Sequence, residues 1–151
     1  MTNRPFYLTL LIAISVMAFL SLGGGVWGAE PDSSHWTFKL FERICHQIPD
    51  RSYSLFDSPM AVNSRCFGIF AGLWFGWLLI PLIIRSKTIR PGATAVFLFL
   101  AVMLQIIDYT GNQISFWENT NDSRALLGFL LGASVSVFLS NLFKPNSNPD
   151  L

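Results

Sequence analysis

Four long apolar runs, separated by polar segments, dominate the pattern of the chain. The runs cover residues 6–28, 67–84, 92–107 and 125–143, and none of them contains a charged side chain. A helix of about 20 apolar residues crosses the roughly 30 Å hydrocarbon core of a bilayer. The pattern therefore predicts an all-α protein, an integral membrane bundle of four transmembrane helices, with the lipid bilayer as its first partner.

The first run has a second interpretation. Arg4, an apolar stretch and the small residues Gly28 and Ala29 also form the pattern of a cleaved signal peptide. The apolar region of a signal peptide has about 7 to 15 residues, and this run is longer. We therefore expect a retained helix and a single four-helix membrane domain over residues 1–144, followed by a short flexible cytoplasmic tail over residues 145–151.

The distribution of positive charge predicts the orientation. Only 13% of the residues are charged, against about 25% in soluble domains, and the net charge of +1 gives no sign of a nucleic-acid partner. The connection 85–91 contains Arg85, Lys87 and Arg90 without an acid, and positive loops stay on the cytoplasmic side. Both termini are then cytoplasmic, the other two connections lie outside, and the protein is a multi-pass protein of the cell (inner) membrane.

Small residues recur every four positions in two of the runs. They are Gly68, Gly72 and Gly76 in the second run, and Gly128, Gly132, Ser136 and Ser140 in the fourth. Such stripes let helices approach closely in a bilayer. They predict the internal seam of the bundle, and the alternative is a contact in a homodimer or a larger membrane complex.

The first outer segment, residues 29–66, is too long for a plain connection, and we expect it to form an outer cap. Within it, Phe38, Phe41 and Cys45 share one face of a helical pattern over residues 36–47. This pattern predicts a short interfacial helix that lies on the membrane.

Several short motifs in the outer segments are distinctive in combination. In order, they are Cys45-His46-Gln47, Arg65-Cys66-x-Gly68, Asp108, and Thr120-Asn121-x-x-Arg124-x-x-x-Gly128. The combination resembles the family of small predicted membrane proteins catalogued as domain of unknown function 2085, over roughly residues 40 to 135. The second motif of that family usually reads Cys-x-Arg-Cys, whereas this chain has Asn63 at the first position. The resemblance implies a membrane fold and a site at these motifs, and it implies no reaction.

The cysteines allow three interpretations. A disulfide between Cys45 and Cys66 on the oxidising outer face would close a loop of about 20 residues and stabilise the fold by about 3 kcal/mol. Cys45, His46 and Cys66 are also candidate ligands of a metal, zinc or iron, although Asn63 removes a fourth thiol. A cysteine nucleophile activated by His46 is the third interpretation.

Three arginines on the outer side suggest an anion site. Arg65 and Arg124 lie at the starts of the second and fourth helices, where unpaired backbone N–H groups and the positive dipole end also face outward. Together with Arg51 and Asn121 they are the candidate ligands of a phosphate or carboxylate. The alternative is that these arginines only anchor the helices at the interface.

Two further residues are candidates for catalysis, namely His46 and Asp108, although the sequence does not decide whether the protein is an enzyme. Our leading hypothesis is an outer-face site for a phosphorylated lipid or other anionic head group. The alternatives are a thiol/disulfide or metal-binding redox protein that uses Cys45 and Cys66, and a structural or assembly subunit.

Overall fold

The structure is a computed structural model, and it describes residues 4–27, 35–86 and 91–143. Several predictions concern residues outside these ranges: the cleavage-like pair at 28–29, the positive charges of Lys87 and Arg90, and the tail over 145–151. The described chain is mostly helical, as predicted.

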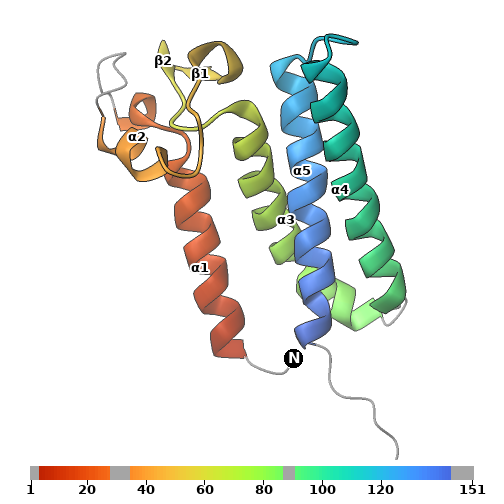
Figure 1. Cartoon of the computed structure of the whole chain (residues 1–151). Coiled ribbons are helices and arrows are strands. Elements are labelled where there is room, and N and C mark those ends of the chain that lie inside the picture. The colour runs from red at the N-terminus through yellow and green to blue at the C-terminus, as the bar shows by residue number, and fades with distance from the viewer. Residues whose placement is uncertain (1–3, 28–34, 87–90, 144–151) are drawn as a thin grey trace, which may run out of the picture.

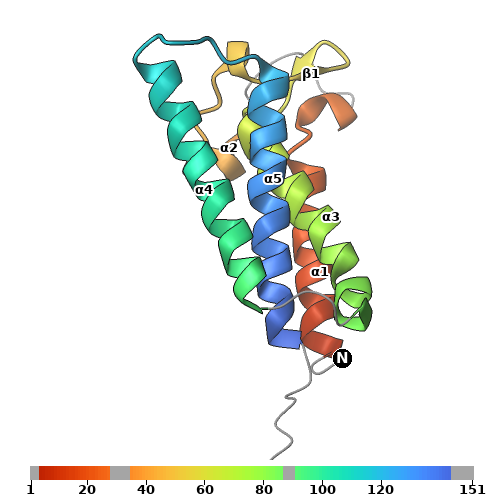
Figure 2. The ribbon, with the colours of Figure 1, turned by 90° about the vertical axis from the view of Figure 1, so that its right-hand side faces the viewer.

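Four long helices run side by side in the bundle (Figures 1 and 2). They are α1 (Arg4–Leu20), α3 (Ser64–Ser86), α4 (Pro91–Gln113) and α5 (Asn121–Leu139), and a short 3₁₀ turn, η3 (Ser140–Phe143), extends α5. Three of them, α3, α4 and α5, are long and apolar enough to cross a membrane. The described part of the chain thus contains three candidate spans, and α1, at 17 residues, is shorter than the predicted run 6–28.

Helix α1 stops early because the chain turns at Gly23. This glycine has a φ of +84°, a conformation that side chains disfavour, and a Cβ there would lie 2.8 Å from the backbone nitrogen of Ala61. A 3₁₀ turn, η1 (Gly24–Trp27), follows it. The end of the first apolar run therefore packs against the outer segment rather than prolonging the helix.

The closest contact in the bundle joins α3 to α5, and both glycine stripes lie in it. A Cβ at Gly68 would lie 2.1 Å from the carbonyl oxygen of Ala125, and one at Gly72 would lie 2.1 Å from that of Phe129. Because the contacts advance in the same direction along both helices, α3 and α5 are parallel. Their N-termini therefore lie at the same end of the bundle.

Four further members of the two stripes lie at the same contact. A Cβ at Gly128 would lie 2.2 Å from the carbonyl oxygen of Arg65, one at Gly132 2.2 Å from that of Ile69, and one at Gly76 2.7 Å from Cβ of Ser136. The Ser136 hydroxyl also donates a hydrogen bond of 2.8 Å to the carbonyl oxygen of Leu73. The stripes thus form a contact between two helices of the same chain.

The outer segment folds over the N-terminal end of α3, and we call this end of the bundle the cap end (Figure 1). The segment contains the helix α2 (Trp36–Phe41), the 3₁₀ turn η2 (Pro49–Arg51), and a hairpin of two short strands, β1 (Ser54–Leu55) and β2 (Ser58–Pro59). Helix α2 is half as long as the predicted helix 36–47. The apolar face that the sequence predicted nevertheless points into the protein, since Phe38, Phe41 and Cys45 are buried.

The outer segment is held by a small apolar cluster. Phe41, Cys45, Ala61 and Val62 form its buried centre, and side chains of α1 and α3 pack around them. Burial of this kind stabilises by about 25 cal/mol per Å² of apolar surface. The cluster fixes the stretch between α2 and α3 on the ends of two helices, so the polar residues of that stretch have defined positions.

Candidate functional site

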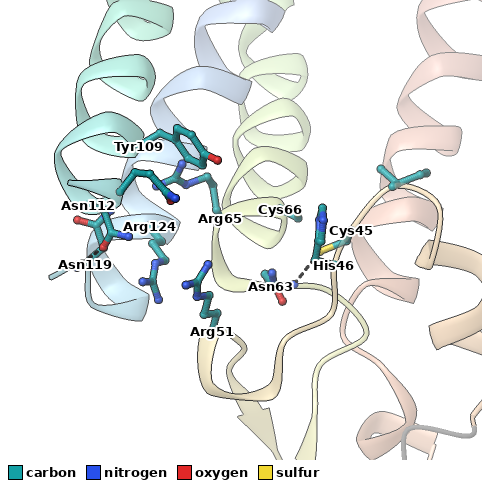
Figure 3. A pocket seen from close by; sticks show the side chains of 12 residues that line it. Cys45, His46, Arg51, Asn63, Arg65, Cys66, Tyr109, Asn112, Asn119 and Arg124 are labelled. Atoms are coloured by element: carbon teal, nitrogen blue, oxygen red, sulfur yellow. Dashed lines mark hydrogen bonds between the residues drawn. The ribbon is translucent and has the colours of Figure 1, made fainter. Parts of the chain in front are cut away.

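A cavity of about 260 Å³ opens at the cap end, between the outer segment and the ends of α3, α4 and α5 (Figure 3). Six residues singled out by the sequence line it together: Cys45, His46, Arg51, Arg65, Cys66 and Arg124. The other lining residues are Ile44, Asn63, Tyr109, Asn112, Gln113 and Asn119. Two more predicted residues, Asn121 and Asp108, are not part of the lining.

Arg65 is the arginine of the cavity with a carboxylate partner. Its guanidinium pairs with Asp108 near the end of α4, and Asn119 donates a further hydrogen bond of 2.7 Å to the same carboxylate oxygen. Asp108 is largely buried, with 8% of its surface exposed. It thus stands behind Arg65, and it orients this side chain instead of facing the cavity.

Neither Arg51 nor Arg124 forms an ion pair with a carboxylate in the part of the chain that the structure describes. Within the described ranges, Arg65 and Asp108 form the sole ion pair between side chains. The charges of Arg51 and Arg65 both act on Arg124, against the opposite charge of Asp108, so the three guanidinium groups lie near one another. The cavity is therefore a region of concentrated positive charge.

Asn121 connects the three segments that carry these arginines. Its amide nitrogen donates a hydrogen bond of 3.3 Å to the carbonyl oxygen of Ser52, and its side-chain oxygen accepts one of 3.3 Å from the Ser64 hydroxyl. Ser52 follows Arg51 and Ser64 precedes Arg65. Asn121 does not line the cavity, and these two hydrogen bonds occupy its amide; its predicted contact with an anion stays a prediction.

A second link joins the outer segment to α5. The Tyr53 hydroxyl donates a hydrogen bond of 2.7 Å to the carboxylate of Asp122. Loss of solvent around the phenol, together with this acceptor, raises the pKa of Tyr53 to about 12. Tyr53 therefore stays protonated and keeps donating across the physiological range.

The predicted disulfide is not formed. Cys45 and Cys66 are both free thiols, and the pair lies 3.3 Å apart without a bond. The Cys66 thiol donates to the Cys45 sulfur, and the backbone N–H of Asn63 donates to the same sulfur over 3.2 Å. These donors, helped by the N–H of Gln47 and by His46, lower the pKa of Cys45 to about 6 against the opposing effect of burial. The lowered pKa favours the thiolate form of Cys45.

Gln47 and Asn63 shape the loop that presents Cys45. Gln47 has a φ of 50°, and its amide donates hydrogen bonds to the carbonyl oxygens of Phe38 (2.7 Å) and Ala61 (2.9 Å). The side-chain oxygen of Asn63 accepts bonds from the Ile48 N–H (2.8 Å) and the Ser52 hydroxyl (3.2 Å). Asn63 is therefore a structural link within the outer segment.

The described residues contain no cluster of side chains that supports the metal interpretation. No group of three or more His, Cys, Asp or Glu side chains lies close enough there to hold a metal ion. Cys45, His46 and Cys66 border the cavity together, but the Asn63 oxygen that could complete a set is engaged with backbone and hydroxyl donors.

Sequence reasoning missed the wall that α4 and its following loop contribute. Tyr109, Asn112 and Gln113 lie beyond the predicted end of the third helix at residue 107, and the Asn112 side chain accepts a bond of 3.1 Å from the Asn119 N–H. The spacing of Asp108 and Asn112, four residues apart, was the available signal, since it continues a helical face past the apolar run.

The fold and the cavity define a class: a helical membrane protein with a basic, thiol-containing pocket at one end of its spans. The chain belongs to the predicted membrane protein family DUF2085, whose profile matches residues 45–138. The match includes every residue that lines the cavity except Ile44.

Two archaeal proteins are similar to this chain. The chain is 30% identical over 149 residues to an uncharacterized protein of Methanocaldococcus jannaschii, covering 93% of this chain and 94% of the relative. It is 31% identical over 97 residues to an uncharacterized protein of Methanothermobacter thermautotrophicus, covering 64% and 85%. No solved structure shows significant similarity to it.

Proposed function

We propose that the protein binds a phosphorylated lipid, or another anionic head group, in the cavity at the cap end. Arg51, Arg65 and Arg124 are the direct ligands. One observation carries the proposal: three guanidinium groups surround one cavity, while the nearby carboxylate of Asp108 is already paired with Arg65. A concentration of positive charge of this kind is costly without an anion.

The chemistry of the cavity favours phosphate. Guanidinium groups present forked donors that match phosphate oxygens two at a time. The parallel packing of α3 and α5 also directs two helix N-termini to this end of the bundle, and helix N-termini favour anions. The volume of about 260 Å³ is slightly below the range of about 300–1,000 Å³ for drug-sized ligands, which suits a head group more than a whole lipid.

The cavity belongs, in this proposal, to the outer face of the cell (inner) membrane. Helix α1 crosses the membrane as well, which gives four spans with both termini in the cytoplasm. Arg85, near the C-terminal end of α3, then belongs to the cytoplasmic loop. Two observations support the arrangement. Large apolar side chains of α1 such as Ile12 are exposed, and Trp36, Leu40 and Ile44, at helical spacing, form an exposed apolar row whose last member borders the cavity. That row is the interfacial face of α2 and the turn after it.

Binding of anionic lipid tests the proposal. The full chain, purified in a mild detergent, is analysed by native mass spectrometry after incubation with vesicles of phosphatidylglycerol or of phosphatidylcholine. Titration with glycerol 1-phosphate then separates the head group from the acyl chains. We expect binding of phosphatidylglycerol and of the soluble phosphate ester, with little binding of phosphatidylcholine.

Matched variants locate the binding. Arg124→Gln and Arg51→Gln are each expected to weaken binding of glycerol 1-phosphate about tenfold or more, because each removes a charge-assisted hydrogen bond. Arg43→Gln is the control, because Arg43 is an exposed arginine of the same outer segment and does not line the cavity. Equal binding by all three variants and the parent would overturn the proposal.

A further inference from the structure

The two thiols and the three arginines share one cavity, and the proposed anion site does not use the thiols. Cys45 and Cys66 are the two cysteines of the whole chain, they lie 3.3 Å apart, and both line the cavity. We propose that this pair is a redox-active dithiol that exchanges with a small disulfide bearing carboxylate or phosphate groups. The anionic substrate class rests on the proposed function, because the arginines select the charge.

The geometry assigns different tasks to the two cysteines. Cys45 receives the N–H of Asn63 at 3.2 Å and the thiol proton of Cys66, so its sulfur is the one prepared to carry negative charge. Thiolates, and not thiols, attack disulfides. Cys45 is only 5% exposed but lines the cavity, so an attacked disulfide enters the cavity itself (Figure 3). Cys66, which donates to Cys45, is placed to resolve the product.

The exchange proceeds in two balanced displacements. The Cys45 thiolate attacks one sulfur of the external disulfide, its S–S bond breaks, and one thiolate leaves and takes a proton from water. Cys66 then releases its proton to water, and its sulfur attacks the Cys45 sulfur of the mixed disulfide, which expels the second thiolate. In total, two cysteines are oxidised to one disulfide and one external disulfide is reduced to two thiols by two electrons.

The arginines act on both partners of this exchange. Arg65 adjoins Cys66 in the sequence, and Arg51 and Arg124 line the same cavity without a carboxylate partner in the described chain. Their positive charges attract an anionic disulfide and stabilise the thiolate that leaves it. A disulfide that carries ammonium groups is repelled by the same charges. Charge selectivity therefore distinguishes this site from an ordinary exposed cysteine.

The closing distance is compatible with a reversible disulfide. A disulfide bond has an S–S length of about 2.05 Å, so a pair at 3.3 Å closes with a movement of about 1 Å. Because Cys45 belongs to the loop after α2 and Cys66 to the first turn of α3, a local shift of that loop provides the movement.

The test uses the full chain in detergent and three disulfide probes. Dithiobis(2-nitrobenzoate) carries two carboxylates and releases a coloured thiolate, dithiodipyridine is neutral, and cystamine carries two ammonium groups. We expect the anionic probe to release two thiolates per chain and to leave a protein 2 Da lighter than the dithiol. We also expect it to react at least tenfold faster than cystamine after correction for the intrinsic reactivity of each probe with a free thiol.

Variants separate this inference from the anion site. Cys66→Ser is expected to release one thiolate and to keep a mixed-disulfide adduct, whereas Cys45→Ser reacts at least tenfold more slowly. Arg51→Gln combined with Arg124→Gln removes the preference for the anionic probe, and Arg43→Gln retains it. The two-thiolate stoichiometry of the unmodified chain tests the dithiol even where a cysteine variant fails to fold.

Two results would overturn the inference. A protein that binds glycerol 1-phosphate but releases no thiolate retains the proposed function and loses the redox pair. A protein that releases two thiolates at equal corrected rates from all probes retains a dithiol and loses the anionic substrate.

Discussion

Arg65 at the start of α3 and Asp108 near the end of α4 form an ion pair that joins residues 43 positions apart in the sequence. Asn119 donates to the same carboxylate, so the pair also holds the loop between α4 and α5. The contact neutralises one of the three arginines that line the cavity. Stability and anion binding therefore depend on Asp108 in opposite directions.

The Asp108→Asn variant separates these two effects. Removing one partner of a partly buried charged hydrogen bond costs about 1.5–3 kcal/mol, so thermal unfolding in detergent moves to lower temperature. The freed charge of Arg65 strengthens binding of glycerol 1-phosphate severalfold at low salt. Glu118→Gln is the control, since Glu118 is an exposed acid of the loop between α4 and α5 and has no ion pair in the described chain. Weaker phosphate binding by Asp108→Asn than by the control contradicts this expectation.

Asn121 is predicted to support the anion site without touching the anion. Asn121→Ala removes the hydrogen bonds to Ser52 and Ser64, which hold the segments of Arg51 and Arg65 against α5. We expect phosphate-ester affinity to fall about three- to tenfold, with a stability loss of about 1 kcal/mol. The measurement is calorimetric titration of the full chain in detergent.

A double-mutant cycle identifies the positioning role. Asn121→Ala and Ser64→Ala break the same link, so their effects on affinity are expected to be strongly non-additive. Asn141→Ala is the control, because Asn141 lies at the opposite end of the helix bundle and bonds Thr94 there. Additive losses from the first pair would show that Asn121 does not act through Ser64.

The helical fold was readable from the apolar runs, but the ends of the helices were not. The third run stops at residue 107 because Asp108 is charged, whereas α4 continues to Gln113. The ion pair with Arg65 offsets the free-energy cost of placing the Asp108 charge in this helix. No local sequence pattern reveals such a partner on another helix. In the first run the helix ends before the apolar residues do, because the chain turns at Gly23 and packs there against Ala61.

The sequence singled out residues of the cavity but not their separate tasks. Arg51, Arg65 and Arg124 attract attention as charges beside apolar helices, and the structure brings all three to one cavity. Asn121 and Asp108 belong to the same motifs and stand behind the lining. The difference between a ligand and its support depends on side-chain direction, which only the packed helices determine.

The contact between α3 and α5 predicts a sharp contrast between two glycines. A Cβ at Gly72 would meet the Phe129 carbonyl oxygen at 2.1 Å, whereas a Cβ at Gly92 would have nothing within 4 Å. Gly72→Ala therefore forces the helices apart and is expected to cost about 1–3 kcal/mol. Gly92→Ala is expected to be neutral or slightly stabilising because alanine favours helix. Thermal unfolding in one detergent compares the two, and an equal effect would contradict the backbone contact.

The last prediction concerns the pH dependence of Cys45. Its pKa of about 6 lies below the ordinary cysteine value of about 8.5, chiefly because Cys66 donates to its sulfur, with help from N–H groups and from His46. Arg65 also lies near the pair, acting on Cys66 from α3. Because of the lowered pKa, Cys45 is mainly a thiolate above pH 6. The rate of its alkylation by neutral iodoacetamide should therefore reach half its maximum near pH 6. Below that pH the thiolate is protonated and the rate falls.

Cys66→Ala provides the decisive comparison for this rate profile. The substitution removes the principal donor, so the midpoint for Cys45 should move toward about 8.5, while the protein remains folded by circular dichroism. The chain unfolded in guanidinium sets the reference near 8.5 for both thiols. Mass spectrometry of the alkylated chain at pH values from 5 to 9 reports the rate at each cysteine. A midpoint that stays near 6 in Cys66→Ala would assign the low pKa to the Asn63 and Gln47 amides instead of to the neighbouring thiol.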